Sequence, residues 1–225
     1  MPVCPPCLHG PEPLAAEFFC VSCRTPFRNR FPLDDHGRCA LCRAGLRAFD
    51  AAYCFGAYEG VLRELIHLFK YQRMRPLAGP LAGFLAAALP RDERFDVVVP
   101  VPLHWRRRWQ RGFNQSELLA RLTARRCGIP VRRAVRRARP TTAQAGLSSA
   151  RRRLNVAGAF RPLPRAGVEG LRVLLIDDVM TTGATASSCA AALKRAGAKS
   201  VALLALARVD RRFGAAALSQ SQGAS

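Results

Sequence analysis

The most informative stretch of this chain reads Val173-Leu-Leu-Ile-Asp177-Asp178-Val-Met-Thr181-Thr182-Gly183-Ala-Thr185. Its first four residues are apolar, which is typical of a strand buried on both faces of a parallel sheet. Two carboxylates follow, and a turn rich in threonine and glycine leads into a helical pattern at 184–196, ending at Gly197. Ligands of open α/β sheets bind at this carboxyl edge of the strands. The stretch therefore predicts an α/β fold with a ligand site between strand and helix.

The turn between this strand and this helix has the composition of a phosphate site. Backbone N–H groups at the start of a helix, with threonine hydroxyls beside them, can hold a phosphate dianion. Gly183 permits a positive φ and a close backbone approach. The two carboxylates would repel that phosphate, so we place them one sugar away, where they accept hydrogen bonds from vicinal hydroxyls or face a Mg²⁺ ion. We expect a cradle for ribose 5-phosphate made of Asp177, Asp178, Thr181, Thr182, Gly183, Ala184 and Thr185.

Two other interpretations of this stretch are weaker. A strand ending in acids also occurs in P-loop nucleotide-binding proteins, but the sequence contains no Gly-x-x-x-x-Gly-Lys-Ser/Thr motif. A purely structural Asp-Asp turn is the second alternative, and it leaves the threonines and the glycine unexplained.

The neighbouring segments supply the other parts of a parallel sheet flanked by helices. Apolar runs at 97–99 and 201–207 predict two more buried strands. Apolar residues at helical spacing predict one helix at 61–70 and another around 77–89, which Pro80 begins or kinks. Buried strands joined by helices indicate a parallel α/β sheet.

A further helix is predicted after Asn114, which we expect to cap it with Glu117 in the capping-box position. Upstream, Trp105, Trp109 and Phe113 are spaced by four residues. This spacing favours one face of a helix packed on the core, and base stacking in a nucleic-acid complex is the alternative.

Two stretches have little pattern of their own. Residues 136–170 are long and weakly patterned, so we expect a lid or a binding loop there, and residues 214–225 are expected to form a disordered tail. The longest apolar stretch, 77–89, has 13 residues and contains Pro80. A membrane-spanning helix needs about 20 apolar residues, so we expect no membrane insertion.

Six of the nine cysteines form three Cys-x-x-Cys pairs. A spacer of two residues lets both thiolates of a pair face one ion, and a second pair completes a tetrahedral shell. The spacing of Cys20, Cys23, Cys39 and Cys42 is typical of a zinc ribbon, in which the metal folds a segment too small to fold alone. A redox dithiol and an iron–sulfur cluster are the alternatives; a thioredoxin-type site would need one pair beside a βαβ unit.

The first cysteine pair, Cys4 and Cys7, has no obvious partner pair. These residues could replace one of the other pairs, or form half of a second site with His9. The isolated cysteines are predicted to be small buried apolar residues: Cys54, Cys127 and Cys189.

The chain is strongly basic: 36 Lys and Arg against 15 Asp and Glu give a formal charge of +21. Fifteen arginines, no lysine and one acidic residue lie between 104 and 153. Such a field attracts polyanions, including nucleic acid and phosphorylated small molecules. The alternative is an ordinary solvated face. A GC-rich genome favours arginine codons over lysine codons, and the whole chain has only three lysines.

With 225 residues, 49% of them apolar, the chain can form one domain and a smaller module, and disorder is excluded as its main state. We divide it into a cysteine-rich zinc-ribbon module (1–48), a larger domain (49–213) and the tail (214–225). Its start carries Cys4 and Cys7 rather than a basic segment followed by an apolar one. We therefore expect no secretory signal and a cytoplasmic protein with reduced thiols.

Several further motifs follow the cysteine pairs: Tyr58-Glu-Gly-Val-Leu-Arg-Glu-Leu-Ile-His67-Leu-Phe-Lys70-Tyr71, Val99-Pro-Val-Pro-Leu, Arg111-Gly-Phe-Asn-Gln115, Gln144-Ala-Gly-Leu147 and Arg152-x-x-Asn155-Val156. Together with the cysteine pairs, these motifs resemble the ComF (competence protein F) family. The stretch 173–185 is itself similar to the signature of the type I phosphoribosyltransferases. The resemblance covers nearly the whole chain. It implies a phosphoribosyltransferase-type parallel sheet flanked by helices, with a small N-terminal zinc ribbon.

The resemblance also implies a ligand and a setting. Members of that family are associated with DNA uptake in natural transformation, so single-stranded DNA and other competence proteins are implied partners. The implied ligand is phosphoribosyl pyrophosphate with Mg²⁺, with Asp177 and Asp178 at the ribose hydroxyls and residues 181–185 at the 5-phosphate. Arg111 would neutralise the leaving pyrophosphate. The implied pyrophosphate-side or lid residues are Pro102, His104, Arg139, Gln144 and Arg152.

The sequence departs from the family pattern in two places. The turn after Val99 lacks the small residues that bring backbone N–H groups close to an anion, and a double ribbon would need a fourth cysteine pair. Two functions therefore stay open. One is a Mg²⁺-dependent phosphoribosyltransferase of nucleotide salvage or biosynthesis, in which attack at the anomeric carbon expels pyrophosphate. The other is a non-catalytic competence factor that binds single-stranded DNA through its basic surface.

Overall fold

The computed structural model describes residues 3–103, 109, 112–138 and 158–209. At its centre lies a four-stranded sheet. From one edge to the other its strands are β3 (Ala51–Ala57), β8 (Ser200–Arg208), β7 (Arg172–Met180) and β4 (Val97–Pro100). All three neighbouring pairs are parallel, so the carboxyl ends of the strands meet at one edge. This arrangement confirms the predicted parallel sheet.

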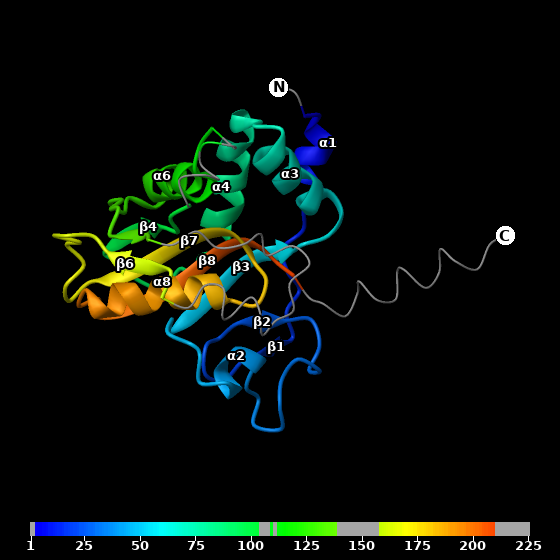
Figure 1. Ribbon diagram of the computed structural model, residues 1–225. Coiled ribbons are helices and arrows are strands. Elements are labelled where there is room, and N and C mark those ends of the chain that lie inside the picture. Colours follow the sequence, from blue (N-terminus) through cyan, green and yellow to red (C-terminus); the bar gives the residue numbers. More distant parts are fainter. Residues whose placement is uncertain (1–2, 104–108, 110–111, 139–157, 210–225) are drawn as a thin grey trace.

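Helices cover both faces of the sheet (Figure 1). On one face lie α3 (Gly60–Tyr71), α4 (Ala78–Ala87) and α6 (Gln115–Cys127), with a short 3₁₀ turn at Arg75–Leu77 before α4. The other face carries α8 (Ala184–Arg195) together with an antiparallel pair of short strands, β5 (Val135–Arg137) and β6 (Phe160–Pro162). The sheet is thus the middle layer of three.

The apolar pattern of α3 explains why this helix forms and how it is oriented. Leu62, Leu65, Ile66 and Phe69 recur every three or four residues and are all buried. They make one stripe that packs toward the sheet, as an amphipathic helix requires. The helix predicted at 61–70 is therefore confirmed. Because its buried stripe faces the sheet, the position of Lys70 near its carboxyl end is fixed relative to the sheet.

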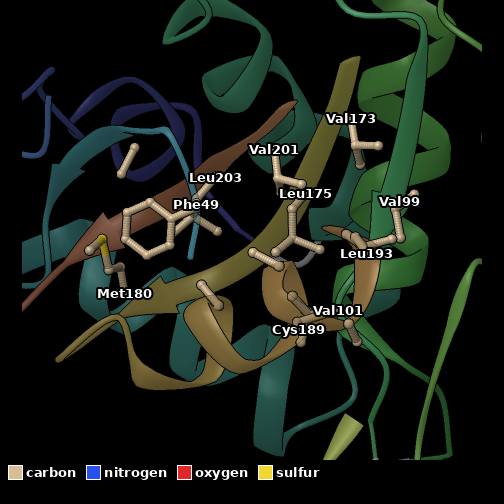
Figure 2. Packing of buried hydrophobic residues seen from close by; sticks show 14 of the residues in the cluster. Phe49, Val99, Val101, Val173, Leu175, Met180, Cys189, Leu193, Val201 and Leu203 are labelled. Atoms are coloured by element: carbon tan, nitrogen blue, oxygen red, sulfur yellow. The ribbon is translucent and has the colours of Figure 1, made fainter. Parts of the chain in front are cut away.

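The core beneath α8 supports the turn that precedes this helix. Figure 2 shows Phe49, Met180 and Leu203 gathered at one end of this core, and Leu175, Cys189 and Leu193 between β7 and α8. All six side chains are at most 7% exposed. Because α8 contributes mostly alanine to this contact, it approaches the sheet closely and its amino end is held rigidly at the carboxyl edge of β7.

The segment 18–43, which carries the four cysteines from Cys20 to Cys42, forms a small unit below the sheet (Figure 1). It contains the antiparallel strands β1 (Phe18–Phe19) and β2 (Pro26–Phe27) and the helical turn α2 (Ala40–Arg43). The short helix α1 (Pro5–His9) lies on the opposite side of the molecule, beside α3 (Figure 1). The chain passes between these two places along β3, where the N–H of Leu14 donates to the carbonyl of Phe55 at 2.6 Å.

Three local predictions differ from the structure. Asn114 stands at the N-cap of α6, but its side-chain amide donates to the carbonyl of Val101 and makes no cap hydrogen bond. The predicted capping box is therefore wrong, because Glu117 instead accepts hydrogen bonds from Arg121 and Arg133. Trp109 is 84% exposed, so its predicted packing on the core is wrong as well.

Parts of the chain outside the predicted elements also form strands. The segment 136–170, expected to be a lid or a binding loop, includes most of β5 and all of β6. Residues 139–157 lie outside the described part, as do Trp105 and the proposed tail at 214–225. In the described ranges, no helix has both the length and the apolar character that crossing a bilayer requires.

Candidate functional site

The candidate site lies where β7 meets α8, at the carboxyl edge of the sheet. The strand predicted at 173–176 is longer in the structure: it continues through Asp177 and Asp178 to Met180, and its register with β8 extends to Met180. Three residues, 181–183, separate the end of β7 from α8, which begins at Ala184. The two carboxylates and the threonine turn are thus joined by only two residues, and both belong to the same edge.

The two aspartates have different surroundings. Lys70, at the end of α3, places its Nζ 2.9 Å from Oδ1 of Asp178, and both side chains are largely buried. Asp177 Oδ1 accepts a hydrogen bond from the hydroxyl of Ser116 at 3.1 Å and another from the backbone N–H of Asp178 at 2.9 Å. Asp178 is therefore held by a charge and Asp177 by neutral donors.

This difference sets the protonation of the pair. Burial, and after it the neighbouring Asp178 carboxylate, raise the pKa of Asp177 to about 7. The ammonium of Lys70 opposes this rise. At neutral pH the Asp177 carboxyl can therefore donate a proton as well as accept one, which suits a partner such as a sugar hydroxyl that does both.

The threonine turn has the backbone that a phosphate site needs. Gly183 is the N-cap of α8 and has φ +75°, a conformation that L side chains rarely adopt. The N–H of Ala184 donates to Thr182 Oγ1 at 3.4 Å, and the N–H of Ser187 begins the regular helix by donating to Gly183. The N–H groups in the first turn of this 12-residue helix have no acceptor within the helix and point out of its amino end. The turn can therefore present N–H groups and hydroxyls to an anion.

The predicted pyrophosphate side is only partly described. Val101 donates its N–H to the carbonyl of Ile176 at 2.9 Å, so the chain stays paired with β7 up to the residue before Pro102. The other residues assigned to this side or to the lid lie outside the described residues: His104, Arg111, Arg139, Gln144 and Arg152.

Two residues of the site were not assigned by sequence reasoning. Lys70 is part of the motif at 58–71, and Ser116 is the second residue of α6, but neither was given a role. The only signal for Lys70 was its place at the end of the predicted helix, one residue after the buried Phe69. Its contact with Asp178 joins segments that are far apart in the sequence, which periodicity does not reveal.

Four cysteines form a second candidate site below the sheet. The Sγ atoms of Cys20, Cys23, Cys39 and Cys42 all lie within 4.8 Å of one another. Cys20 to Cys42 and Cys23 to Cys39 each measure 3.7 Å between sulfurs. A disulfide would need about 2.05 Å, whereas four sulfurs at about 2.3 Å from a central zinc are separated by nearly the observed distance. These residues therefore fit a tetrahedral metal site.

The thiols of this cluster differ in acidity. Hydrogen bonds, first of all the one with Cys23, lower the pKa of Cys39 to about 5, whereas the same contact and burial raise the pKa of Cys23. Burial raises the pKa of Cys42 to about 12.

Cys4 and Cys7 are not in this cluster. Their sulfurs lie 3.0 Å apart and their pair stands at the amino end of α1, away from the ribbon (Figure 1).

The aspartate pair does not fit a magnesium ion in the same way. Within the described ranges, the four cysteines are the only group of three or more potential ligand residues with ligand atoms close together. Mg²⁺ requires an octahedral set of oxygens, but Asp178 already pairs with Lys70, and Asp177 Oδ1 accepts two hydrogen bonds. These two residues therefore form no ready magnesium site.

The cysteine unit also contacts the threonine turn. A Cβ built on Gly183 would come within 3.2 Å of Leu41 Cδ2 and 3.0 Å of Met180 Cε. Ser187 on α8 accepts the N–H of Ala48 at 2.9 Å and donates to the carbonyl of Leu46. The unit thus packs against the amino end of α8.

Comparison with known proteins adds family information to this geometry. The model of the phosphoribosyl transferase domain matches residues 114–217, which include the aspartates and the threonine turn. Competence protein F of Haemophilus influenzae is 30% identical over 90% of this chain and 96% of its own length. The DNA utilization protein YhgH of Escherichia coli K12 is 34% identical over 84% of this chain and 83% of its own length.

Among solved structures, adenine phosphoribosyltransferase from Thermoanaerobacter pseudethanolicus is 19% identical, with a TM-score of 0.38 over 62% of this chain and 81% of that one. The domain match and the parallel sheet flanked by helices together give a fold of the type I phosphoribosyltransferase kind.

Proposed function

The chain belongs to the competence protein F family, and from that premise we propose that it binds phosphoribosyl pyrophosphate or a related sugar phosphate at the β7–α8 edge. The supporting observation is that Asp177, Asp178 and the threonine turn stand together at the carboxyl end of one buried strand. Relatives of this chain are named for competence and for DNA utilization. We propose accordingly that this protein acts in DNA uptake.

Each part of the site has a distinct task in this proposal. The backbone N–H groups and hydroxyls of residues 181–185 hold the 5-phosphate in the field of the α8 dipole. Asp177 and Asp178 bind the vicinal ribose hydroxyls one sugar length away. The pyrophosphate lies toward Pro102, and Arg111 and the arginines of the 139–157 segment neutralise it. Mg²⁺ accompanies the ligand on its pyrophosphate oxygens, because the aspartates do not fit as its ligands.

Isothermal titration calorimetry with phosphoribosyl pyrophosphate tests the site. Asp178→Asn removes a charged acceptor of a ribose hydroxyl and should weaken binding by about tenfold or more, since such hydrogen bonds contribute about 1.5–3 kcal/mol. Asp92→Asn is the matched control, because Asp92 is exposed in the segment before β4, at the opposite end of the sheet. Equal affinity of wild type and Asp178→Asn would refute the assignment.

A pyrophosphate-release assay across nucleobases and amines then separates a transferase from a binding protein. Release that depends on one acceptor and is lost in Asp178→Asn supports transfer at the anomeric carbon. Binding without release for every acceptor supports a phosphate-binding competence factor with a phosphoribosyltransferase fold.

Binding of single-stranded DNA is the second candidate function, and the surface charge favours it. Arginines at six positions of the described part of α6 and the segment after it are exposed: Arg121, Arg125, Arg126, Arg132, Arg133 and Arg136. Glu117 pairs with only two of them. The remaining charge is therefore available to phosphates.

Salt dependence tests this second candidate. The affinity for a single-stranded oligonucleotide should fall steeply with salt, and replacing Arg106, Arg107 and Arg108 by glutamine should flatten that slope. Arg91 and Arg94, at the amino end of β4, provide control substitutions that should leave the slope nearly unchanged. A flat salt profile of the wild type would count against DNA binding.

We further propose that Cys20, Cys23, Cys39 and Cys42 hold a structural Zn²⁺. This proposal is supported by two sulfur pairs at 3.7 Å, close to the separation in a tetrahedral zinc–thiolate site, and by all four sulfurs lying within 4.8 Å of one another. All four positions are filled by protein sulfurs, as in a closed structural site, so the ion would stabilise the fold and leave no coordination position open for a substrate.

A further inference from the structure

Lys70 is the one lysine that the structure places against the acidic pair. Its Nζ lies 2.9 Å from Asp178 Oδ1, and the two side chains are only 12% and 13% exposed. The Coulomb attraction within an ion pair that is largely withdrawn from water is stronger than at the surface, because screening is weak there. Lys70 is thus a fixed part of the edge at which β7 ends.

The surrounding helices hold this lysine in place. Lys70 follows Phe69, the last residue of the buried stripe of α3, and Phe69 is 0% exposed. The ring of Phe69 contacts the ring of Phe113 edge-on at 5.3 Å, just before α6 begins. From α6, Ser116 donates to Asp177. The same two helices therefore carry the groups that contact both aspartates.

A divalent cation at these carboxylates would have to compete with the ammonium group of Lys70. To coordinate Asp178 it would have to displace an ammonium that is already in contact with Oδ1, or bind beside it and suffer like-charge repulsion. Asp177 offers little compensation, since its Oδ1 accepts hydrogen bonds from Ser116 and from the backbone. The described part of the chain brings no third carboxylate or imidazole to this place.

We propose that Lys70 supplies the positive charge that the aspartate pair needs, so that the ribose end of the site works without a divalent cation bound to Asp177 and Asp178. This role deepens the sugar-phosphate function proposed above and rests on it. Lys70 acts through Asp178 as a positioning residue: it neutralises the carboxylate and turns its free oxygen toward the ligand. Any Mg²⁺ that accompanies phosphoribosyl pyrophosphate is then carried by the pyrophosphate alone.

Titration with Mn²⁺ alone, followed by electron paramagnetic resonance on the zinc-loaded protein, tests this role without any sugar phosphate. The wild type should show no Mn²⁺ site that depends on Asp178. Lys70→Met frees the carboxylate pair and should create such a site, which a second substitution, Asp178→Asn, should abolish. Lys194→Met is the matched control: Lys194 pairs with Asp50 at the surface, 2.6 Å from its Oδ1, and its loss should create no site that depends on Asp178.

A Mn²⁺ site in the wild type that disappears in Asp178→Asn would overturn the proposal. Absence of Mn²⁺ binding in a folded Lys70→Met would overturn it as well, because the lysine would then not stand where a cation can bind. The wild-type measurement remains decisive even if Lys70→Met fails to fold.

Calorimetry with ribose 5-phosphate supplies the functional readout. Its affinity for the wild type should change less than about twofold between a chelator and excess Mg²⁺. In Lys70→Met it should fall about tenfold in chelator and recover in part with Mg²⁺, while Lys70→Arg should keep most of the affinity. A wild type that binds only with Mg²⁺ would refute the role of Lys70. Failure to bind any sugar phosphate would refute the proposed function while leaving the Mn²⁺ result to stand on its own.

Discussion

Leu41 packs against Gly183: a Cβ built on this glycine would lie 3.2 Å from Leu41 Cδ2. Leu41 stands between two residues of the cysteine cluster, Cys39 and Cys42, and Gly183 is the N-cap of α8. The cysteine unit and the threonine turn are therefore in direct contact. A well-ordered cysteine unit therefore helps to hold the threonine turn in its conformation, because a displacement of one group in a packed contact shifts its neighbour.

Leu41→Ala should consequently weaken the threonine turn as well as the cysteine unit. Leu41 is 7% exposed, and truncation of a buried leucine costs about 2–5 kcal/mol. We expect a lower melting temperature and weaker binding of phosphoribosyl pyrophosphate by calorimetry. Leu46→Ala provides the control, since Leu46 belongs to the same region but is 47% exposed. Unchanged binding in a folded, zinc-loaded Leu41→Ala would show that the contact does not support the turn.

Gly183→Ala should be destabilising for two reasons at once. A side chain at φ +75° is strained, and its Cβ would lie 3.0 Å from Met180 Cε. Together these effects should cost about 1–3 kcal/mol of unfolding free energy. The same substitution at Gly83, inside α4 with nothing within 4 Å of the added Cβ, should instead stabilise by up to about 1 kcal/mol. Thermal or urea unfolding measures both, and equal effects at the two positions would contradict the geometry.

Zinc content should follow the cysteine cluster and not the first cysteine pair. We expect one zinc ion per chain by elemental analysis, lost in Cys39→Ser and retained in Cys4→Ser, because Cys4 and Cys7 lie away from the four clustered sulfurs. Chelation should lower the melting temperature of the wild type and leave that of Cys39→Ser unchanged. Two zinc ions in the wild type and one in Cys4→Ser would instead indicate a second site at the first pair.

The carboxyl edge of the sheet could be predicted from the sequence because its signals are local. An apolar run, two acids and a glycine turn lie within thirteen consecutive residues, and each has a fixed structural meaning. The cysteine cluster could be predicted for the same reason. β3 was missed: Ala51–Ala57 reads Ala-Ala-Tyr-Cys-Phe-Gly-Ala, without the β-branched residues typical of a strand.

What the sequence could not reveal depends on contacts between distant segments. β3 is a strand because it pairs with β8, which follows it by most of the chain length. Lys70 belongs to the site only because α3 and β7 meet in space, and the contact of Leu41 with Gly183 arises in the same way. Helical spacing placed Lys70 at the end of its helix, but only tertiary packing decides which charge it meets.

Acid stability should depend on an ion pair at the opposite end of the sheet. Arg172 donates to both carboxylate oxygens of Asp96, at 2.8 Å and 3.1 Å, and its backbone N–H donates as well at 2.8 Å. These hydrogen bonds hold the pKa of Asp96 at about 2. In the unfolded chain the pKa of an aspartate is about 3.9. The pair therefore stabilises the fold fully above about pH 4, and this contribution disappears as the pH falls toward 2.

Asp96→Asn should remove this contribution, because its neutral amide keeps the size of the side chain but loses the charge. Urea unfolding at a series of pH values should find the variant less stable than the wild type at neutral pH. The two proteins should converge between about pH 4 and pH 2, where the wild-type carboxyl also becomes neutral. Loss of zinc in acid affects both proteins alike and cancels in the difference. A difference in stability that stays constant down to pH 2 would mean that packing, and not the charge of Asp96, is what the substitution disturbs.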